Sequence, residues 1–301
     1  MPELPDVELY CAALRREIVG RPLQQVRIVS PFLVRSIAPP LADAEGRTVA
    51  GVFRVGKRIV WDLEDEWFFV FHLMVAGRFR WKPTGAALPG RISLAAFDFS
   101  TGTLVLTEAG SRKRASLHVV TGRGALASHD PGGLEPLEAP LEAFEGRLRL
   151  ENHTLKRSLT DPHLFSGIGN AYSDEILHEA RLSPVVLTSR LTEDEVARLY
   201  RATQRVLREW TRRLREEAGE RFPEKVTAFR EGMAVHGRFG QPCRACGTPV
   251  QRIAYAASEC NYCPTCQTGG RLLADRGLSR LLGKDWPRTL EELERRRPHP
   301  R

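Results

Sequence analysis

The sequence lacks any segment long and apolar enough to cross a membrane as a helix. Its longest apolar run, Trp67 to Gly77, includes His72 and is far shorter than the ~20 residues that a membrane helix needs. The first residues include Glu3, Asp6 and Glu8, which a secretory leader would not carry. We therefore expect a soluble protein of the cell interior with no membrane partner.

Cysteine is also scarce. Six cysteines in 301 residues are too few for a disulfide scaffold, and five of them lie between Cys243 and Cys266. The pairs Cys243/Cys246 and Cys263/Cys266 each have C-x-x-C spacing, and two such pairs form a closed site of four sulfurs. Such a site is typical of one structural Zn²⁺, because no position remains for a catalytic water. Cys260 and Cys263 also have this spacing, so either pair could contribute; we favour Cys263 and Cys266, with Cys260 a free thiol near the metal.

Neither disorder nor a repeat architecture fits the composition. The chain is 42% hydrophobic and 27% charged, which is ordinary for a globular protein, and its length suggests two domains. Lysine and arginine number 45 against 37 acidic residues, a net charge of +8. This excess favours an anionic partner, nucleic acid first.

The apolar pattern changes along the chain. Residues 6–20 have helical spacing, with Val7, Tyr10, Leu14 and Ile18 on one face. Residues 22–121 then contain short β-rich runs broken by Gly and Pro, which predict a packed β-sandwich or barrel. The runs are Val26–Val29, Val52–Val55, Arg58–Leu63, Phe68–Leu73 and Thr103–Leu106.

The second half is predicted to be mainly helical. A stretch rich in Gly and Pro from Asp130 indicates a domain boundary. Thr192 and Glu195 have the spacing of a capping box at the start of a long helix. Ser166-Gly-Ile-Gly-Asn170 precedes another helix, and glycines there allow a phosphate to approach the helix N-terminus, although many such turns have no ligand.

Pro2 is the first candidate catalytic residue. A small residue after Met1 permits removal of the initiator, which leaves a secondary amine on Pro2. An α-amino group has a pKa of ~7.7–8, well below ~10.4 for lysine, so more of it is nucleophilic near neutrality. Glu3 is adjacent and Asp6 lies one helical turn further on. Acid-assisted imine chemistry is one interpretation, and simple capping of a helix start is the other.

Several further motifs follow one another along the chain. Each has an ordinary structural explanation when taken alone; Lys57, for instance, has the pattern of an exposed surface lysine. The motifs are Pro2-Glu-Leu-Pro-Asp-Val-Glu8, Gly56-Lys57, His72-Leu-Met74, Leu155-Lys156, Gly167-Ile-Gly-Asn-Ala-Tyr-Ser-Asp-Glu175, Gly237-Arg238 and the two C-x-x-C pairs. From about residue 2 to 267, the chain resembles the formamidopyrimidine-DNA glycosylase/endonuclease VIII family of base-excision repair enzymes.

The resemblance implies an α+β fold: an N-terminal β-sandwich with one long helix, and a C-terminal helical domain with a helix–two-turn–helix motif and a zinc β-hairpin finger. We expect a catalytic domain over 2–128, the helical domain over 129–234, the finger over 235–268 and a C-terminal extension over 269–301.

The implied function is a bifunctional DNA glycosylase and AP lyase that excises a damaged base through a Schiff base on Pro2. Glu3 would protonate the sugar, and Lys57 would contact phosphate and assist proton transfer. Asp6 completes the catalytic set, at a position where the family usually has glutamate. The partner would be damaged or abasic DNA, double-stranded rather than single-stranded. We expect a monomer in the cytoplasm, with the nucleoid if the source is bacterial.

The resemblance also implies the residues that contact DNA. Lys156 and Asn170 would hold phosphates, and Met74 would fill the gap left by the flipped base. The other expected DNA contacts are Arg112, Arg114 and Arg238.

Departures from the family pattern leave the lesion open. The loop with Arg112 and Arg114 lacks the usual aromatic wedge, Ser258 stands at the finger-tip position of an arginine, and His236 replaces a usual tyrosine. A non-catalytic damaged-DNA binder and a zinc-knuckle RNA- or ribosome-associated protein are the alternatives. Retention of Pro2, Glu3 and Lys57 argues against the non-catalytic binder, and the N-terminal Pro2-Glu3 argues against the RNA- or ribosome-associated protein, because a binding module needs no free amine.

Overall fold

The structure is a computed structural model that describes residues 1–88, 90–224, 226–227, 229–255, 259–274 and 282–295. The chain divides into two compact units. The first comprises Met1–Gly133 with Arg208–Ala228, and the second comprises Leu134–Leu207 with Phe229–Arg301. The finer domain boundaries expected above stay a prediction. Among the described helices, none has both the length and the apolar composition needed to cross a membrane.

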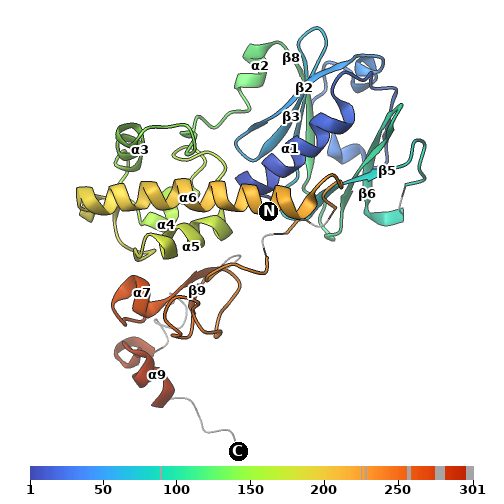
Figure 1. The fold of residues 1–301 in the computed structure, drawn as a ribbon. Coiled ribbons are helices and arrows are strands. Elements are labelled where there is room, and N and C mark those ends of the chain that lie inside the picture. Colours follow the sequence, from blue (N-terminus) through green and yellow to red (C-terminus); the bar gives the residue numbers. More distant parts are fainter. Residues whose placement is uncertain (89, 225, 228, 256–258, 275–281, 296–301) are drawn as a thin grey trace, which may run out of the picture. The chain divides into compact units, whose positions relative to one another are not determined.

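The first unit is built on two four-stranded antiparallel sheets (Figure 1). One sheet has the order β1-β6-β7-β5 and the other the order β2-β3-β4-β8. The strands are β1 Gln25–Ile28, β2 Val49–Val55, β3 Arg58–Leu63, β4 Trp67–His72, β5 Gly77–Lys82, β6 Ser93–Phe99, β7 Gly102–Glu108 and β8 Ser116–Thr121. The expected sandwich is therefore confirmed, and each of the five predicted runs overlaps a strand.

Aromatic side chains join the two sheets of the sandwich. The ring of Trp61 on β3 lies 4.8 Å from that of Phe71 on β4 and 5.2 Å from that of Phe97 on β6. All three residues are fully buried. Because Phe97 belongs to the other sheet, this cluster fixes how the sheets face each other.

Helix α1 (Leu4–Ile18) packs on the sandwich along the face that the sequence predicts. Val7, Tyr10, Leu14 and Ile18 have no exposed surface, and all belong to the same core as the inner faces of the sheets. Packing this face also buries the start of the chain, which positions the candidate nucleophile.

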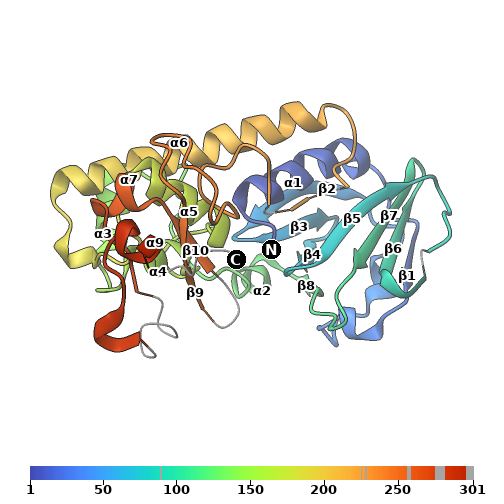
Figure 2. The same cartoon turned by 90° about the horizontal axis from the view of Figure 1, so that it is seen from below.

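The second unit is mainly helical, and its described residues also include a β-hairpin (Figure 2). Its helices are α3 Leu141–Leu148, α4 Leu155–Thr160, α5 Asn170–Glu179, the first part of α6 Glu193–Ala218, α7 Pro264–Thr268 and α9 Leu290–Arg295; α2 Arg123–Ala127 belongs to the first unit. The hairpin consists of β9 Gln251–Ala254 and β10 Glu259–Tyr262, paired antiparallel.

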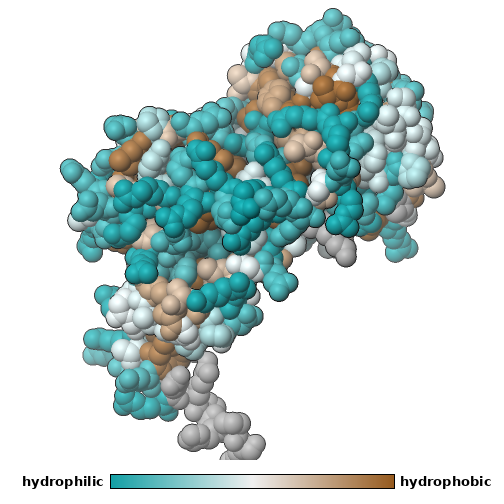
Figure 3. Space-filling view, viewed as in Figure 1, coloured by the Kyte–Doolittle hydropathy of each residue, from teal (hydrophilic) through white to brown (hydrophobic). Residues whose placement is uncertain are grey.

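Helix α6 begins with the capping box predicted from the sequence. The N–H of Thr192 donates to Oε2 of Glu195 at 3.0 Å, and the N–H of Glu195 donates to Oγ1 of Thr192 at 3.2 Å. Hydrophilic residues cover the side of α6 that faces the viewer (Figure 3), while Leu199, Leu207 and Leu214 are buried on another side. The amphipathic pattern therefore explains both faces of the helix.

The aromatic cluster leads to a stability prediction. We expect Trp61→Ala to lower the free energy of unfolding by ~3–5 kcal/mol, because it removes the ring that contacts both sheets. Urea unfolding followed by circular dichroism measures the change. Phe32→Ala is the matched control, because Phe32 is 75% exposed, and it should change stability by less than ~0.5 kcal/mol. Equal effects of the two substitutions would contradict the role given to Trp61.

Candidate functional site

The start of the chain is buried and held by hydrogen bonds. Pro2 lies in the interior of the first unit, and only 3% of Glu3 is exposed. The N–H of Glu3 donates to Oδ2 of Asp6 at 2.9 Å, and the two residues form a capping box at the start of α1. Asp6 is fully buried, so its carboxylate fixes the backbone that carries Pro2 and Glu3.

Charged side chains surround the amine of the chain start. Burial lowers the pKa of the Met1 amine; Glu3 and Asp6 oppose this shift, while Arg78 and Lys57 add to it. These four side chains therefore lie close enough to act on the amine. A lowered pKa increases the fraction of unprotonated, nucleophilic amine at neutral pH.

Lys57 lies in the turn between β2 and β3, directly after Gly56. Gly56 has a φ of +58°, which glycine adopts without the steric cost of a side chain. The charge of Lys57 also lowers the pKa of His72 on β4. The turn thus brings Lys57 into the neighbourhood of Glu3 and Asp6, as the electrostatic effect on the Met1 amine shows.

Met74 lies at the loop between β4 and β5 in a strained conformation. Its φ is +54°, which is uncommon outside glycine. The loop is tight: the N–H of Gly77 donates to the carbonyl of Leu73 at 2.9 Å, and a Cβ on Gly77 would lie 2.3 Å from that oxygen. Strain that the surrounding structure enforces is typical of functional loops, which is consistent with the role expected for Met74.

Arg112 and Arg114 are exposed on the loop between β7 and β8. The buried carboxylate of Glu108 anchors this loop: its Oε2 accepts from the N–H of Arg114 at 2.9 Å and from the N–H of Ala115 at 3.1 Å. The loop therefore has a fixed base, and its two arginines extend into solvent where an anion can reach them.

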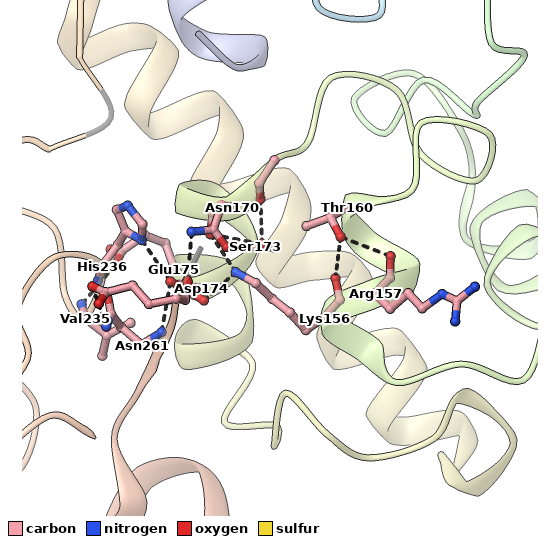
Figure 4. A network of polar contacts seen from close by, with 12 residues as sticks. Lys156, Arg157, Thr160, Asn170, Ser173, Asp174, Glu175, Val235, His236 and Asn261 are labelled. Atoms are coloured by element: carbon pink, nitrogen blue, oxygen red, sulfur yellow. Dashed lines mark hydrogen bonds and ion pairs between the residues drawn. The ribbon is translucent and has the colours of Figure 1, made fainter. Parts of the chain in front are cut away.

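Lys156, on α4, forms a buried ion pair with Asp174 of α5 (Figure 4). Its Nζ donates to Oδ1 of Asp174 at 2.5 Å and to the carbonyl of Asn170 at 2.6 Å. The other oxygen of Asp174, Oδ2, contacts Nδ1 of His236 at 2.8 Å and accepts from the N–H of Asn261 at 3.1 Å. Asp174 has no exposed surface, so donors from three chain segments compensate its charge.

Asn170, the first residue of α5, also has an internal partner. Its Nδ2 donates to the carbonyl of Glu259 on β10 at 2.8 Å. An ammonium has three N–H donors and an amide has two, so Lys156 and Asn170 each keep one donor beyond these contacts. Both predicted phosphate-binding side chains are thus oriented by the fold and still able to bind a further acceptor.

Glu175 follows Asp174 and holds the loop that precedes the cysteine pairs. Its carboxylate accepts from the N–H groups of Ala234 at 2.7 Å, Val235 at 2.9 Å and His236 at 2.9 Å. Burial raises the pKa of Glu175, and the three N–H donors oppose that shift. The carboxylates of Asp174 and Glu175, which are adjacent in the chain, therefore both attach this loop to α5.

The guanidinium of Arg238 binds backbone carbonyls of its own loop. Its Nη1 donates to the carbonyl of Met233 at 3.3 Å and its Nη2 to the carbonyl of Pro242 at 2.9 Å. These contacts make Arg238 a clamp on the backbone that leads to Cys243. The structure does not place a DNA-binding role on it, and that role stays a prediction.

Four cysteines gather at one point of the second unit. The Sγ atoms of Cys243, Cys246, Cys263 and Cys266 all lie within 4.8 Å of one another. Two of the separations, Cys243–Cys266 and Cys246–Cys263, are 4.0 and 3.4 Å. A tetrahedral ion with ~2.3 Å Zn–S bonds would place its sulfurs ~3.8 Å apart. The group therefore fits a metal ion with four thiolate ligands.

Cys260 is not part of this group. It is fully buried with Ile253, Tyr262 and Leu273 in a separate apolar cluster. Burial raises the pKa of its thiol, and the nearby Asp174 raises it further. Ser258, the expected finger-tip residue, lies outside the described residues.

Comparisons with known proteins place the chain in a family. Residues 1–117 match the formamidopyrimidine-DNA glycosylase N-terminal domain, and residues 133–217 match the H2TH domain of the same enzyme. The formamidopyrimidine-DNA glycosylase of Thermus thermophilus is 36% identical over 282 residues, which cover 90% of this chain and all of that protein. The chain belongs to the formamidopyrimidine-DNA glycosylase family. It is therefore a base-excision DNA glycosylase and AP lyase by family.

Solved structures of the family share the fold. The Lactococcus lactis enzyme in complex with abasic-site DNA has a TM-score of 0.77 and 25% identity, with 88% of this chain and 99% of that chain covered. MutM in complex with DNA containing carbocyclic 8-oxo-G gives the same TM-score and identity, over 89% of this chain and all of that one. The expected α+β architecture is confirmed.

Some residues that contact the candidate site residues, or act on them electrostatically, belong to none of the sequence motifs. Arg78 acts on the chain-start amine from β5, Glu108 anchors the arginine loop, and Nε2 of His178 lies 3.3 Å from Sγ of Cys243. A histidine that contacts a thiolate ligand orients it, as outer-shell partners of metal sites do. His178 could have been noticed only as a histidine on the buried face of α5.

The histidine beside Lys57 gives a pH prediction for the first unit. Burial, helped by the charges of Arg58 and Lys57, lowers the pKa of His72 to about 4. As the pH falls from ~6.5 towards 4, the unfolded chain binds a proton that the folded protein does not, so stability falls. We expect His72→Asn to reduce this pH dependence, measured by urea unfolding at several pH values between 7 and 4.5.

The comparison variant is His163→Asn, which replaces an exposed histidine of the second unit, so that the loss of a buried histidine is measured against the loss of an exposed one. The titration midpoint of His72 in a proton NMR experiment gives an independent check. A midpoint near 6.5 would contradict the burial argument.

Proposed function

We propose that the enzyme acts through the amine of Pro2, which becomes the chain terminus once Met1 is removed. The observation that carries this proposal is the burial of Pro2 beside the buried Glu3 and Asp6, at a chain start where burial lowers the pKa of the Met1 amine and the charge of Lys57 adds to that shift. A non-catalytic binder has no need of a buried amine held beside a carboxylate.

The proposed reaction begins with attack of the Pro2 nitrogen on C1′ of the damaged nucleotide. Glu3 protonates the ring oxygen O4′ as the nitrogen bonds to C1′, and the C1′–O4′ bond breaks with its electron pair on O4′. The nitrogen then loses its proton to the Glu3 carboxylate, and its lone pair expels the base, so an iminium forms. The base leaves with the electron pair of the glycosidic bond and takes up a proton from solvent. Loss of the C2′ proton expels the 3′ phosphate and cleaves the strand, and hydrolysis of the conjugated iminium releases the enzyme.

Three neighbouring side chains support this chemistry in different ways. Asp6 is a positioning residue, because it binds the N–H of Glu3 and has no exposed surface. Lys57 and Arg78 place positive charge near the amine, which favours its neutral form and offers contacts for the phosphates that flank the lesion.

DNA, double-stranded and damaged or abasic, is the proposed substrate. Its phosphates would bind the remaining donors of Lys156 and Asn170 and the exposed Arg112 and Arg114. These contacts position DNA without selecting a sequence. Met74 is proposed to fill the space of the flipped base. Such a substrate implies work in the cytoplasm, at the nucleoid in a bacterium.

We infer that the metal of the four-cysteine group is zinc. A closed set of four thiolates suits a structural zinc better than a catalytic one, because no ligand position is open. When bound, zinc would have a structural role only. It would cross-link the loop that carries Cys243 and Cys246 to the segment after β10 that carries Cys263 and Cys266. His178 would keep Cys243 oriented.

Reduction with borohydride tests the nucleophile. We expect the wild-type enzyme to form a permanent crosslink to abasic DNA, and mass spectrometry should map it to Pro2. An uncleaved extension before Pro2 should abolish the crosslink, because an amide nitrogen is not nucleophilic. Glu3→Gln should lower base excision by ~10²–10⁴-fold, since it removes the acid, yet leave substantial reaction at a pre-formed abasic site.

Lys57→Ala is the matched control, because its proposed role is in phosphate contact and proton transfer. It should weaken both activities but retain the crosslink at Pro2. A crosslink that maps to Lys57, or one that survives the N-terminal extension, would overturn the assignment of Pro2.

Metal analysis tests the zinc site. We expect about one zinc per chain by atomic emission, with loss of the metal in Cys266→Ser because three thiolates remain. Cys260→Ser is the control and should keep the metal, since Cys260 lies in the separate apolar cluster. The reverse result, with metal lost only in Cys260→Ser, would show that the wrong C-x-x-C pair was chosen.

A further inference from the structure

The C-terminal part of the second unit contains a pocket that the DNA chemistry does not use. Its volume is about 720 Å³, which is typical of a ligand site. It is lined by Val185, Arg271, Leu272, Leu273, Ala274, Trp286 and Arg288. A second pocket of about 280 Å³ shares Val185, Arg271 and Leu273 with it and adds Arg190. The two pockets adjoin, and together we name them the C-terminal recess.

Hydrogen bonds hold the walls of the recess. The N–H of Leu272 donates to the carbonyl of Arg288 at 2.8 Å, so the residues before α9 pair with those after α7. The N–H of Leu273 donates to the hydroxyl of Tyr262 at 2.7 Å, and Tyr262 is itself buried at the end of β10. Figures 1 and 2 both show α7 and α9 close together. Hydrogen bonds within the second unit therefore fix the segments that line the recess.

The recess is cationic. Arg190, Arg271 and Arg288 line it, and none of the other described lining residues is acidic. All three arginines are exposed, and none of their guanidinium groups forms an ion pair among the described residues. The carboxylate of Glu292 accepts from the N–H of Arg288 at 2.7 Å and not from its guanidinium. Guanidinium groups that no carboxylate pairs favour a ligand that carries carboxylates or phosphates.

The recess is also apolar between these charges. Val185 is 40% exposed, and the aliphatic side chains of Leu272 and Leu273 and the ring of Trp286 form its walls. The Nε1–H of Trp286 is buried and has no acceptor among the described residues. An unsatisfied buried donor is costly, so an acceptor brought to it by a ligand would stabilise the complex.

We propose that the C-terminal recess binds an acidic peptide segment of a partner protein. An apolar side chain of the peptide fills the larger pocket against Leu272 and Trp286. Flanking carboxylates pair with Arg271 and Arg288, and with Arg190 at the adjoining pocket. Two pockets that share Val185, Arg271 and Leu273 offer neighbouring positions for successive side chains of an extended peptide. The net charge of +8 on this chain attracts an acidic partner.

A DNA backbone fits the same recess less well. Phosphates would bind the arginines, but the backbone of a duplex has no apolar side chain that could fill the larger pocket against Val185, Leu272 and Leu273. A concave, partly apolar recess therefore favours a ligand that is both acidic and apolar. The proposal does not depend on the nucleophile assigned to Pro2.

Fluorescence anisotropy with a labelled peptide, EELFEE, tests the proposal on the full-length zinc-loaded protein. We expect saturable binding in the micromolar range. QQLFQQ, without charge, and EESSEE, without apolar side chains, should each bind at least about tenfold more weakly, because each lacks one half of the recognition. A short undamaged duplex should not displace the peptide.

Substitutions of residues that line the recess test whether the peptide binds there. Arg271→Ala and Arg288→Ala should weaken EELFEE about fivefold or more, and Trp286→Phe, which keeps a ring but removes the N–H, should weaken it as well. Arg201→Ala is the control, because Arg201 is exposed on α6 of the same unit, and it should bind like the wild type. All variants should retain cleavage of abasic DNA.

Four results would overturn the proposal: no binding of EELFEE, equal binding of EESSEE or QQLFQQ, no effect of Arg271→Ala and Arg288→Ala, or displacement by duplex DNA. The last result would make the recess a nucleic-acid surface. Circular dichroism and zinc content show whether a variant is folded, and Trp286→Phe remains informative if an arginine variant is not.

Discussion

The second unit depends on the burial of one carboxylate, that of Asp174. A charge without exposed surface is tolerated only where donors surround it, and Asp174 has them from α4, from the loop around His236 and from β10. The donors come from segments far apart in the sequence. Burial of the Asp174 carboxylate therefore requires that α4, the loop around His236 and the β9–β10 hairpin all pack against α5.

This arrangement gives the predicted phosphate-binding side chains a double role. Lys156 holds α4 to α5 and Asn170 holds the hairpin to α5 through their internal contacts, and each keeps one further donor. A side chain already fixed in its rotamer loses less entropy when it binds a phosphate. His236, where the family usually has tyrosine, contacts Asp174, so this departure changes the internal network of the second unit.

The first unit follows a comparable constraint at the chain start. Burial of the apolar face of α1 removes the terminus from water, and a terminus without water needs the polar partners that Glu3 and Asp6 provide. The same desolvation lowers the pKa of the Met1 amine. Packing of α1 and burial of the chain start are thus consequences of one event, the docking of a helix on an aromatic sandwich.

The sequence alone determined the local features. Period-two and helical spacing predicted the strands and the faces of α1 and α6, and the C-x-x-C spacing singled out the cysteines, because these signals arise from neighbours in the chain. The motif order indicated the family, and with it Pro2, Glu3 and Lys57 as candidates.

Only the tertiary structure decided how distant residues meet. It grouped Cys263 and Cys266 with Cys243 and Cys246 and placed Cys260 in a different cluster. It also brought Arg78 to the chain start and His178 to Cys243, and it assembled the C-terminal recess from three separate segments. Such contacts join residues tens or hundreds of positions apart, and no local spacing encodes them, because they result from burying the apolar faces and the charges of the whole unit together.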